Sequence, residues 1–161
     1  RVLDASHALT VDILGTDLQR REDEAGLRES ARAIAALIDR ERGRGIAANR
    51  IVLAGFSQGC AMTLMTGLRY PERLAGLVGM SGYLPLAATT AAERSEANRD
   101  VPVFLAHGHD DEIVVPARGE ASREALVALG HDVEWHSYPM GHSVCPEEIG
   151  DLNRWLVAVL G

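Results

Sequence analysis

The sequence contains no lysine, and all 16 of its basic residues are arginines. This absence excludes enzymes that form a Schiff base on a lysine and nucleotide-binding sites that need a P-loop lysine. Cysteine is scarce as well, because Cys60 and Cys145 are the only two. Two cysteines are too few for a disulfide framework, so we expect a reducing compartment and a cytoplasmic location. We also expect no membrane span, because no apolar run approaches the ~20 residues that cross a bilayer.

Positive charge is scarce relative to negative charge. The 16 basic residues stand against 23 acidic ones, which gives a formal net charge of −7. This balance argues against nucleic acid or an anionic membrane surface as the main partner. What the chain does have is an ordinary globular composition, with 47% hydrophobic and 24% charged residues over a length of 161. We therefore expect a single domain over residues 1–161, in which residues 1–20 are weakly patterned.

The spacing of apolar residues predicts strands that alternate with helices. Short apolar runs typical of strands occupy residues 51–54, 74–80, 101–106 and 133–138. Helical spacing occupies residues 22–42, 58–69, 116–129 and 146–159. Residues 81–100 show no clear strand, and we expect there either a surface insertion or a flap over a site. The alternation predicts an α/β fold with a parallel sheet.

The sharpest motif is Gly55-Phe56-Ser57-Gln58-Gly59, which follows the pattern Gly-x-Ser-x-Gly. It falls between a predicted strand and a predicted helix, where the chain must reverse within a few residues. The two glycines remove side chains that would clash in such a turn, and the serine stands at its tip as a nucleophile. The N-terminus of the following helix offers backbone N–H groups to a developing oxyanion. The alternative is a glycine-rich turn without chemistry.

A serine nucleophile requires a histidine base and a carboxylate that orients the base. The third predicted strand runs into a loop with Asp110 and Asp111, and the fourth runs into a loop with His142. Both loops follow the carboxyl ends of strands, at the sheet edge where Ser57 also lies. The chain order Ser, Asp, His agrees with such an architecture. We therefore predict His142 as the general base, whereas the local sequence does not decide between Asp110 and Asp111.

The other histidines have simpler structural interpretations. We expect His7 and His131 at the surface and His136 packed within its strand. His107 and His109 flank a glycine in the acid loop and are compatible with a structural role.

A metal site is the rival interpretation of the acid loop. The run His107-x-His109-x-Asp111 reproduces most of the ligand pattern of metallo-β-lactamase-like hydrolases. That pattern normally continues with another histidine, whereas Glu112 stands here. It also leaves the motif around Ser57 unexplained, so we expect no metal and no other cofactor.

Further stretches match one known family when they are taken with the Ser57 motif. They are Arg69-Tyr70-Pro71, Ser81-Gly82-Tyr83-Leu84, His107-Gly108 followed by Asp111 and Val114, and Met140-Gly141-His142-Ser143. Over about residues 12–161 the chain resembles the acyl-protein thioesterase and carboxylesterase family of α/β-hydrolases. The resemblance implies a doubly wound, mostly parallel sheet with helices on both faces. It also implies a cofactor-free serine hydrolase that cleaves carboxylic esters, or in some members thioesters of lipidated proteins.

The resemblance assigns roles to individual residues. The family's acid motif, His-Gly-x-x-Asp, selects Asp111 over Asp110 as the carboxylate. The implied catalytic set is Ser57, Asp111 and His142, with the backbone N–H of Gln58 as an oxyanion donor. The implied substrate contacts come from Leu84 and Met140.

Two features depart from the family pattern. Cys60 stands where the family commonly has glycine after the motif, a small change that we expect to be tolerated. The family also has further strands before the first predicted helix and a His-Gly-rich loop with a second oxyanion donor. We therefore expect an N-terminally incomplete α/β-hydrolase domain that corresponds to about the C-terminal three-quarters.

The implied substrate is a small ester or thioester, or an acylated protein, and the resemblance is compatible with a homodimer. The alternative function is a catalytically impaired, α/β-hydrolase-like binding module, which lacks activity because those strands are absent.

Overall fold

The computed structural model describes residues 23–161, whose strands form one parallel sheet. The strand order is β1-β2-β3-β4, the order of the chain. The strands are β1 (Val52–Phe56), β2 (Gly76–Met80), β3 (Val103–Gly108) and β4 (Val133–Tyr138). The α-helices are α1 (Glu24–Gly43), α2 (Gln58–Arg69), α3 (Ala87–Glu93), α4 (Pro116–Ala128) and α5 (Pro146–Leu160), and a 3-10 turn η1 (Ala48–Arg50) precedes β1.

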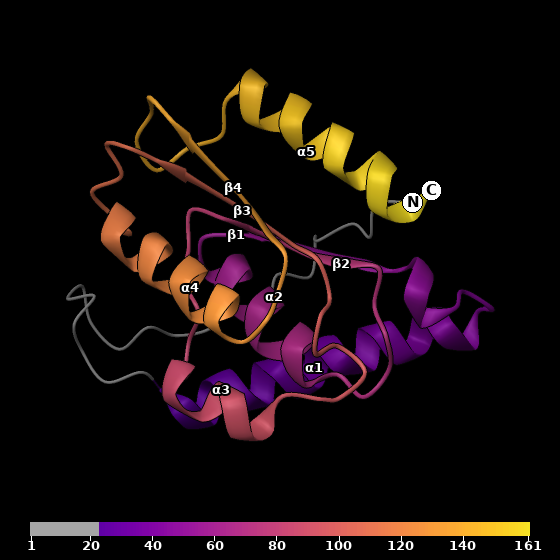
Figure 1. The fold of residues 1–161 in the computed structure, drawn as a ribbon. Helices are drawn as coiled ribbons and strands as arrows, with labels where there is room; N and C mark the ends of the chain where they lie inside the picture. The colour runs from indigo at the N-terminus through magenta and orange to yellow at the C-terminus, as the bar shows by residue number, and fades with distance from the viewer. Residues whose placement is uncertain (1–22) are drawn as a thin grey trace.

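Helices cover both faces of the sheet (Figure 1). On one face α2 contacts β1 and β2, and α4 contacts β3 and β4. The main core between these layers includes Leu64, Leu77, Leu105 and Leu126. On the other face α5 brings Trp155 against the ring of Phe104, with the centroids 5.9 Å apart. The fold is therefore a parallel α/β sheet with helices on both faces, as the sequence predicts.

Helix α1 lies on α2 rather than directly on the sheet. The side chain of Asp23 caps it by accepting a hydrogen bond from the N–H of Gly26 at 3.0 Å, and such a cap is worth about 1 kcal/mol. Its apolar stripe includes the buried Leu27, which packs with Met62 and Met65 of α2. The predicted helical periodicity is confirmed, with α2 as the surface that it covers.

The segment 81–100 contains the short helix α3, which the sequence pattern did not predict. Glu93 at its end pairs with Arg28 of α1 at 2.8 Å and with Arg69 of α2 at 3.0 Å. Figure 1 accordingly shows α3 beside the beginning of α1. Thr90 in the middle of α3 is fully buried, so this segment is packed against the two helices.

Strand β1 lies at the edge of the sheet that residues 23–161 form. All six residues of β3 are buried, whereas β1 is half-buried along its length and exposes Ala54. The predicted features of residues 1–20 and of His7 lie outside the described residues. Within the described part of the chain, no helix is both long and apolar enough to cross a bilayer.

Candidate active site

Ser57 occupies a strained turn between β1 and α2. Its backbone adopts φ 55° and ψ −115°, a region that non-glycine residues rarely enter. The Ser57 N–H donates to the Met80 carbonyl of β2 at 2.8 Å, which anchors the turn to the sheet. The side chain is thereby presented at the carboxyl edge of the strands, as the Gly-x-Ser-x-Gly motif predicts.

The two glycines of the motif differ in what they allow. A Cβ atom on Gly55 would lie 2.1 Å from the backbone of Gly59, so only glycine permits this close approach of strand and helix. A Cβ atom on Gly59 would meet nothing within 4 Å. The expectation that both glycines relieve a clash is therefore right for Gly55 and wrong for Gly59.

The acid loop and the histidine loop are bound to each other by their backbones. The N–H of His109 donates to the Tyr138 carbonyl at 2.8 Å, and the N–H of Asp110 donates to the Met140 carbonyl at 3.1 Å. A Cβ atom on Gly108 would lie 2.2 Å from that same Met140 oxygen. Glycine at this position allows the two loops to touch, and their contact brings the carboxylate and the imidazole together.

Ser57, His142 and Asp111 form one hydrogen-bonded series. His142 Nε2 lies 3.0 Å from Ser57 Oγ, and His142 Nδ1 lies 2.8 Å from Asp111 Oδ2. A carboxylate only accepts, so Nδ1 carries the proton and Nε2 is left to accept from the serine hydroxyl. Asp110, by contrast, is exposed at the surface. The structure therefore brings together the three residues that the family resemblance implies.

Asp111 is held as a buried anion. Its side chain is fully buried, and burial alone would raise the pKa of the carboxyl group. The hydrogen bonds from His142 and from the N–H groups of Val114 and Ile113 outweigh that effect, so the pKa of Asp111 lies below its ordinary value. The carboxylate is thus charged at neutral pH.

Phe56 and the N–H groups of Ile113 and Val114 complete the site, and the sequence analysis assigned no role to them. The ring of Phe56 lies 4.8 Å from the imidazole of His142, centroid to centroid. Both N–H groups donate to Asp111 Oδ1 at 2.9 Å. The place of Phe56 directly before the serine was the available signal, whereas backbone donors leave no signature in side-chain types.

The residues of the rival metal run are engaged in other contacts. His107 Nε2 lies 2.7 Å from the Val114 carbonyl, Asp111 binds His142, and His109 is exposed. Residues 23–161 contain no group of three or more histidine, cysteine, aspartate or glutamate side chains placed to hold a metal ion.

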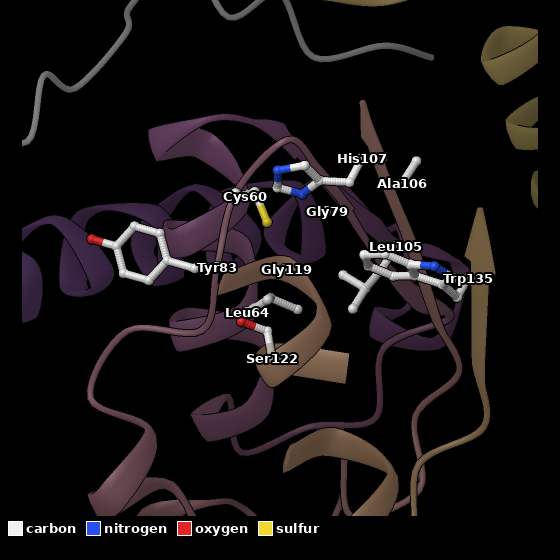
Figure 2. A pocket seen from close by; sticks show the side chains of 11 residues that line it. Cys60, Leu64, Gly79, Tyr83, Leu105, Ala106, His107, Gly119, Ser122 and Trp135 are labelled. Atoms are coloured by element: carbon white, nitrogen blue, oxygen red, sulfur yellow. The ribbon is translucent and has the colours of Figure 1, made fainter. Parts of the chain in front are cut away.

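The remaining sequence candidates lie around the site. Leu84 is 5% exposed and belongs to the main core, while Met140 is half-buried in the histidine loop. Cys60 lies under the Ser57 turn, where burial raises the pKa of its thiol to about 12. Figure 2 shows Cys60 in the lining of a small pocket that also includes His107 and does not include Ser57.

One histidine differs from its predicted place. His131 is buried rather than at the surface, because its Nδ1 donates to the Val101 carbonyl at 2.9 Å. His136 packs within β4 as predicted, with its Nε2 2.8 Å from Glu134.

Comparison with known proteins assigns the chain to a family. A family model described as phospholipase/carboxylesterase matches residues 11–160. The chain belongs to this family. Acyl-protein thioesterase 1 of Gibberella zeae is 44% identical to this chain over 149 residues, covering 89% of this chain and 63% of the relative. Acyl-protein thioesterase 1 of Yarrowia lipolytica is 40% identical over 138 residues, covering 84% of this chain and 61% of the relative.

Solved structures agree with this membership of the phospholipase/carboxylesterase family. Arabidopsis thaliana SOBER1 superposes with a TM-score of 0.82 at 30% identity, covering 86% of this chain and 67% of that one. Zea mays acyl-protein thioesterase 2 superposes with a TM-score of 0.80 at 30% identity, covering 94% of this chain and 72% of that one. The chain spans about three-fifths of the length of the curated relatives named above.

Proposed function

We propose that the chain is a serine hydrolase that cleaves carboxylic esters and thioesters through an acyl-enzyme on Ser57. The observation that carries the proposal is the continuous hydrogen bonding from Ser57 Oγ through His142 to Asp111, with distances of 3.0 and 2.8 Å. This arrangement fixes the imidazole tautomer that accepts a proton from the serine.

The reaction follows from these positions. Ser57 Oγ attacks the carbonyl carbon of the substrate while its proton passes to His142 Nε2, and Asp111 stabilises the resulting imidazolium. His142 then returns the proton to the departing alkoxide or thiolate, which leaves the acyl group bonded to Ser57. Water is next deprotonated by His142 and attacks the acyl carbon, and proton return to Ser57 Oγ releases the carboxylic acid.

The N-terminus of α2 supports the negative oxygen of each tetrahedral intermediate. Gln58 begins α2, so its N–H has no acceptor one turn earlier in the helix. This N–H and the positive end of the helix dipole lie directly after Ser57, and we propose Gln58 as an oxyanion donor. One such donor is typically worth about 10²–10³ in rate.

The substrate class is an acyl group carried by a small molecule or by a protein. The relatives from Gibberella zeae and Yarrowia lipolytica are named acyl-protein thioesterases, which supports thioesters beside oxygen esters. We propose Met140 and Leu84 as acyl contacts, the latter after local opening because it is 5% exposed. The two unpaired thiols support a reducing compartment such as the cytoplasm, and the net charge of −7 supports a partner other than nucleic acid.

A fluorophosphonate probe tests the proposal, because it phosphonylates a serine only when a neighbouring base activates it. We expect stoichiometric labelling of the chain at Ser57 and turnover of a short p-nitrophenyl ester. Ser57→Ala should lose both, with at most a residual of about 10³ over water. A folded chain that binds acyl ligands but takes no label would instead be the catalytically impaired binding module.

A further inference from the structure

A second histidine, His107, also lies near Asp111, beside the same carboxylate oxygen that His142 contacts. His107 is the next-to-last residue of β3 and is 1% exposed. Its Nε2 atom lies 2.7 Å from the Val114 carbonyl and 3.5 Å from Asp111 Oδ2. A carbonyl oxygen only accepts, so Nε2 carries a proton and donates a hydrogen bond to the Val114 carbonyl. The proton-bearing edge of this imidazole therefore also faces the Asp111 carboxylate.

The hydrogen bond from His107 to the Val114 carbonyl joins the two ends of the acid loop. Val114 is held at both of its backbone groups, because its carbonyl accepts from His107 and its N–H donates to Asp111 Oδ1 at 2.9 Å. Ile113 donates to the same oxygen at 2.9 Å. With Oδ1 fixed in this way, Oδ2 is directed at His142 Nδ1, 2.8 Å away. The position of the carboxylate thus depends on where Val114 is held.

The ring of His107 is itself fixed by its surroundings. It stacks on Trp135, with centroids 6.3 Å apart and an interplanar angle of 24°. A Cβ atom on Gly119 would lie 2.5 Å from His107 Nδ1, so α4 closes off that edge of the ring. Figure 2 shows His107 and Trp135 together in the lining of the small pocket.

We propose that His107 is a positioning residue, which holds the acid loop so that Asp111 is aligned with His142. The inference rests on the proposed function of the Ser57 site. His107 does not touch the serine, so its loss should act through the orientation of Asp111. A displacement of about 1 Å in such a group costs roughly 10²-fold in rate, and the effect should fall on kcat rather than on KM.

Three variants of the full chain test this role. His107→Phe removes the hydrogen bond and keeps a flat ring. His107→Gln restores an N–H donor at about the reach of Nε2. His131→Phe is the matched control, because His131 is 5% exposed and also donates to a buried carbonyl, that of Val101 at 2.9 Å. It lies before β4, at the sheet edge opposite the site.

The readouts are kcat and KM on a short p-nitrophenyl ester and the downfield proton NMR signal of His142 Nδ1–H. We expect His107→Phe to lower kcat about 100-fold with KM unchanged, and to shift or broaden that signal. His107→Gln should retain kcat within about tenfold of the original chain. His131→Phe should lower the melting temperature comparably while leaving kcat and the signal unchanged.

If His107→Phe and His131→Phe have the same kcat and the same NMR signal, the proposal is overturned. His107 would then be a packing residue only. If His107→Phe does not fold, His107→Asn replaces it, because its shorter amide does not reach the Val114 carbonyl. Equal activity of the Asn and Gln variants would then overturn it. Failure of the proposed function is a separate result, recognised by absent labelling of the unsubstituted chain, while the NMR signal still reports the alignment of Asp111 and His142.

Discussion

At the scale of single residues, the acid loop holds two adjacent aspartates in opposite environments. Asp111 is buried and bonded to His142, while Asp110 is exposed and contributes its backbone N–H to the Met140 carbonyl. The local sequence Asp-Asp contains no information about this difference. The difference arises from the loop, whose Ile113 and Val114 N–H groups converge on the second carboxylate.

We therefore expect Asp111→Asn and Asp110→Asn to differ widely in activity. Asparagine at position 111 keeps the shape but favours the wrong tautomer of His142, a change worth about 10⁴ in kcat where this geometry operates. Asparagine at position 110 should change kcat by less than about twofold, because that side chain lies at the surface. Steady-state kinetics on a p-nitrophenyl ester measures both, and equal losses would contradict the assignment of Asp111.

Alanine substitutions should likewise separate the two glycines of the serine motif. Gly55→Ala forces a methyl group into the backbone of α2, and we expect the free energy of unfolding to fall by about 1–3 kcal/mol. We also expect the variant to lose labelling by the fluorophosphonate probe. Gly59→Ala faces open space, so its stability should change by less than about 1 kcal/mol, with alanine the better helix former. Urea unfolding and probe labelling of the two variants make the comparison. Comparable damage from both would mean that the space beside Gly59 is filled in solution.

At the scale of elements, periodicity predicted the long helices and all four strands, because each has a continuous apolar face or run. The boundaries shifted by a few residues; β2, for example, begins at Gly76 rather than at residue 74. Helix α3 was missed because it is seven residues long and its sequence lacks a clear stripe. Its position depends on ion pairs from Glu93 to Arg28 and Arg69, which lie 65 and 24 residues away in the chain.

In the site, too, features defined by local sequence were predictable, whereas those that depend on distant contacts were not. The serine turn was predictable because a local motif and its flanking elements define it, and His142 because its loop follows a strand. The burial of His131 was not predictable, because it depends on the Val101 carbonyl 30 residues earlier. The role inferred for His107 has the same origin, since its acceptor is a backbone group that no side-chain pattern reveals.

Helix α5 carries a buried carboxyl group in its first turn. Glu148 is fully buried, and neither of its side-chain oxygens has a hydrogen-bond partner of ordinary geometry among the described residues. Burial raises the pKa of Glu148, and the nearby N–H of Cys145 offsets only part of that effect. The folded state therefore keeps a proton that the unfolded state releases above its ordinary pKa. This contribution to stability is present at low pH and is lost as the pH rises through the folded pKa.

Glu148→Gln should accordingly gain stability relative to the original chain as the pH rises. Glutamine resembles the protonated acid, so the two free energies of unfolding should be similar near pH 4 and diverge above the ordinary pKa of 4.5. The divergence should level off once the pH exceeds the folded pKa. Urea unfolding across this range measures it, with the exposed neighbour Glu147→Gln as the control. A gap that is independent of pH would show that Glu148 is already ionised in the folded protein.

At the scale of the whole molecule, the sheet of residues 23–161 has an apolar edge. Strand β1 pairs with β2 on one side, and within the described residues no strand pairs with its other side. Its five residues, Val52–Phe56, are all apolar, yet they are at most half-buried. Unpaired N–H and C=O groups along an apolar strand form a template for pairing with another chain. A net charge of −7 opposes association only weakly once salt screens it.

We therefore expect the chain of 161 residues to self-associate through β1, and a single lysine to reverse this. Ala54 is exposed on that strand, and Ala54→Lys places there the charge that natural edge strands use against pairing. Ala121→Lys on the exposed face of α4 is the control. Each substitution brings the net charge from −7 to −6, so a general charge effect would favour association in both variants. Light scattering after size exclusion should show oligomers for the original chain and for Ala121→Lys, and monomers for Ala54→Lys. A monomeric original chain at all concentrations, or oligomers that persist in Ala54→Lys, would show that β1 is not the associating edge.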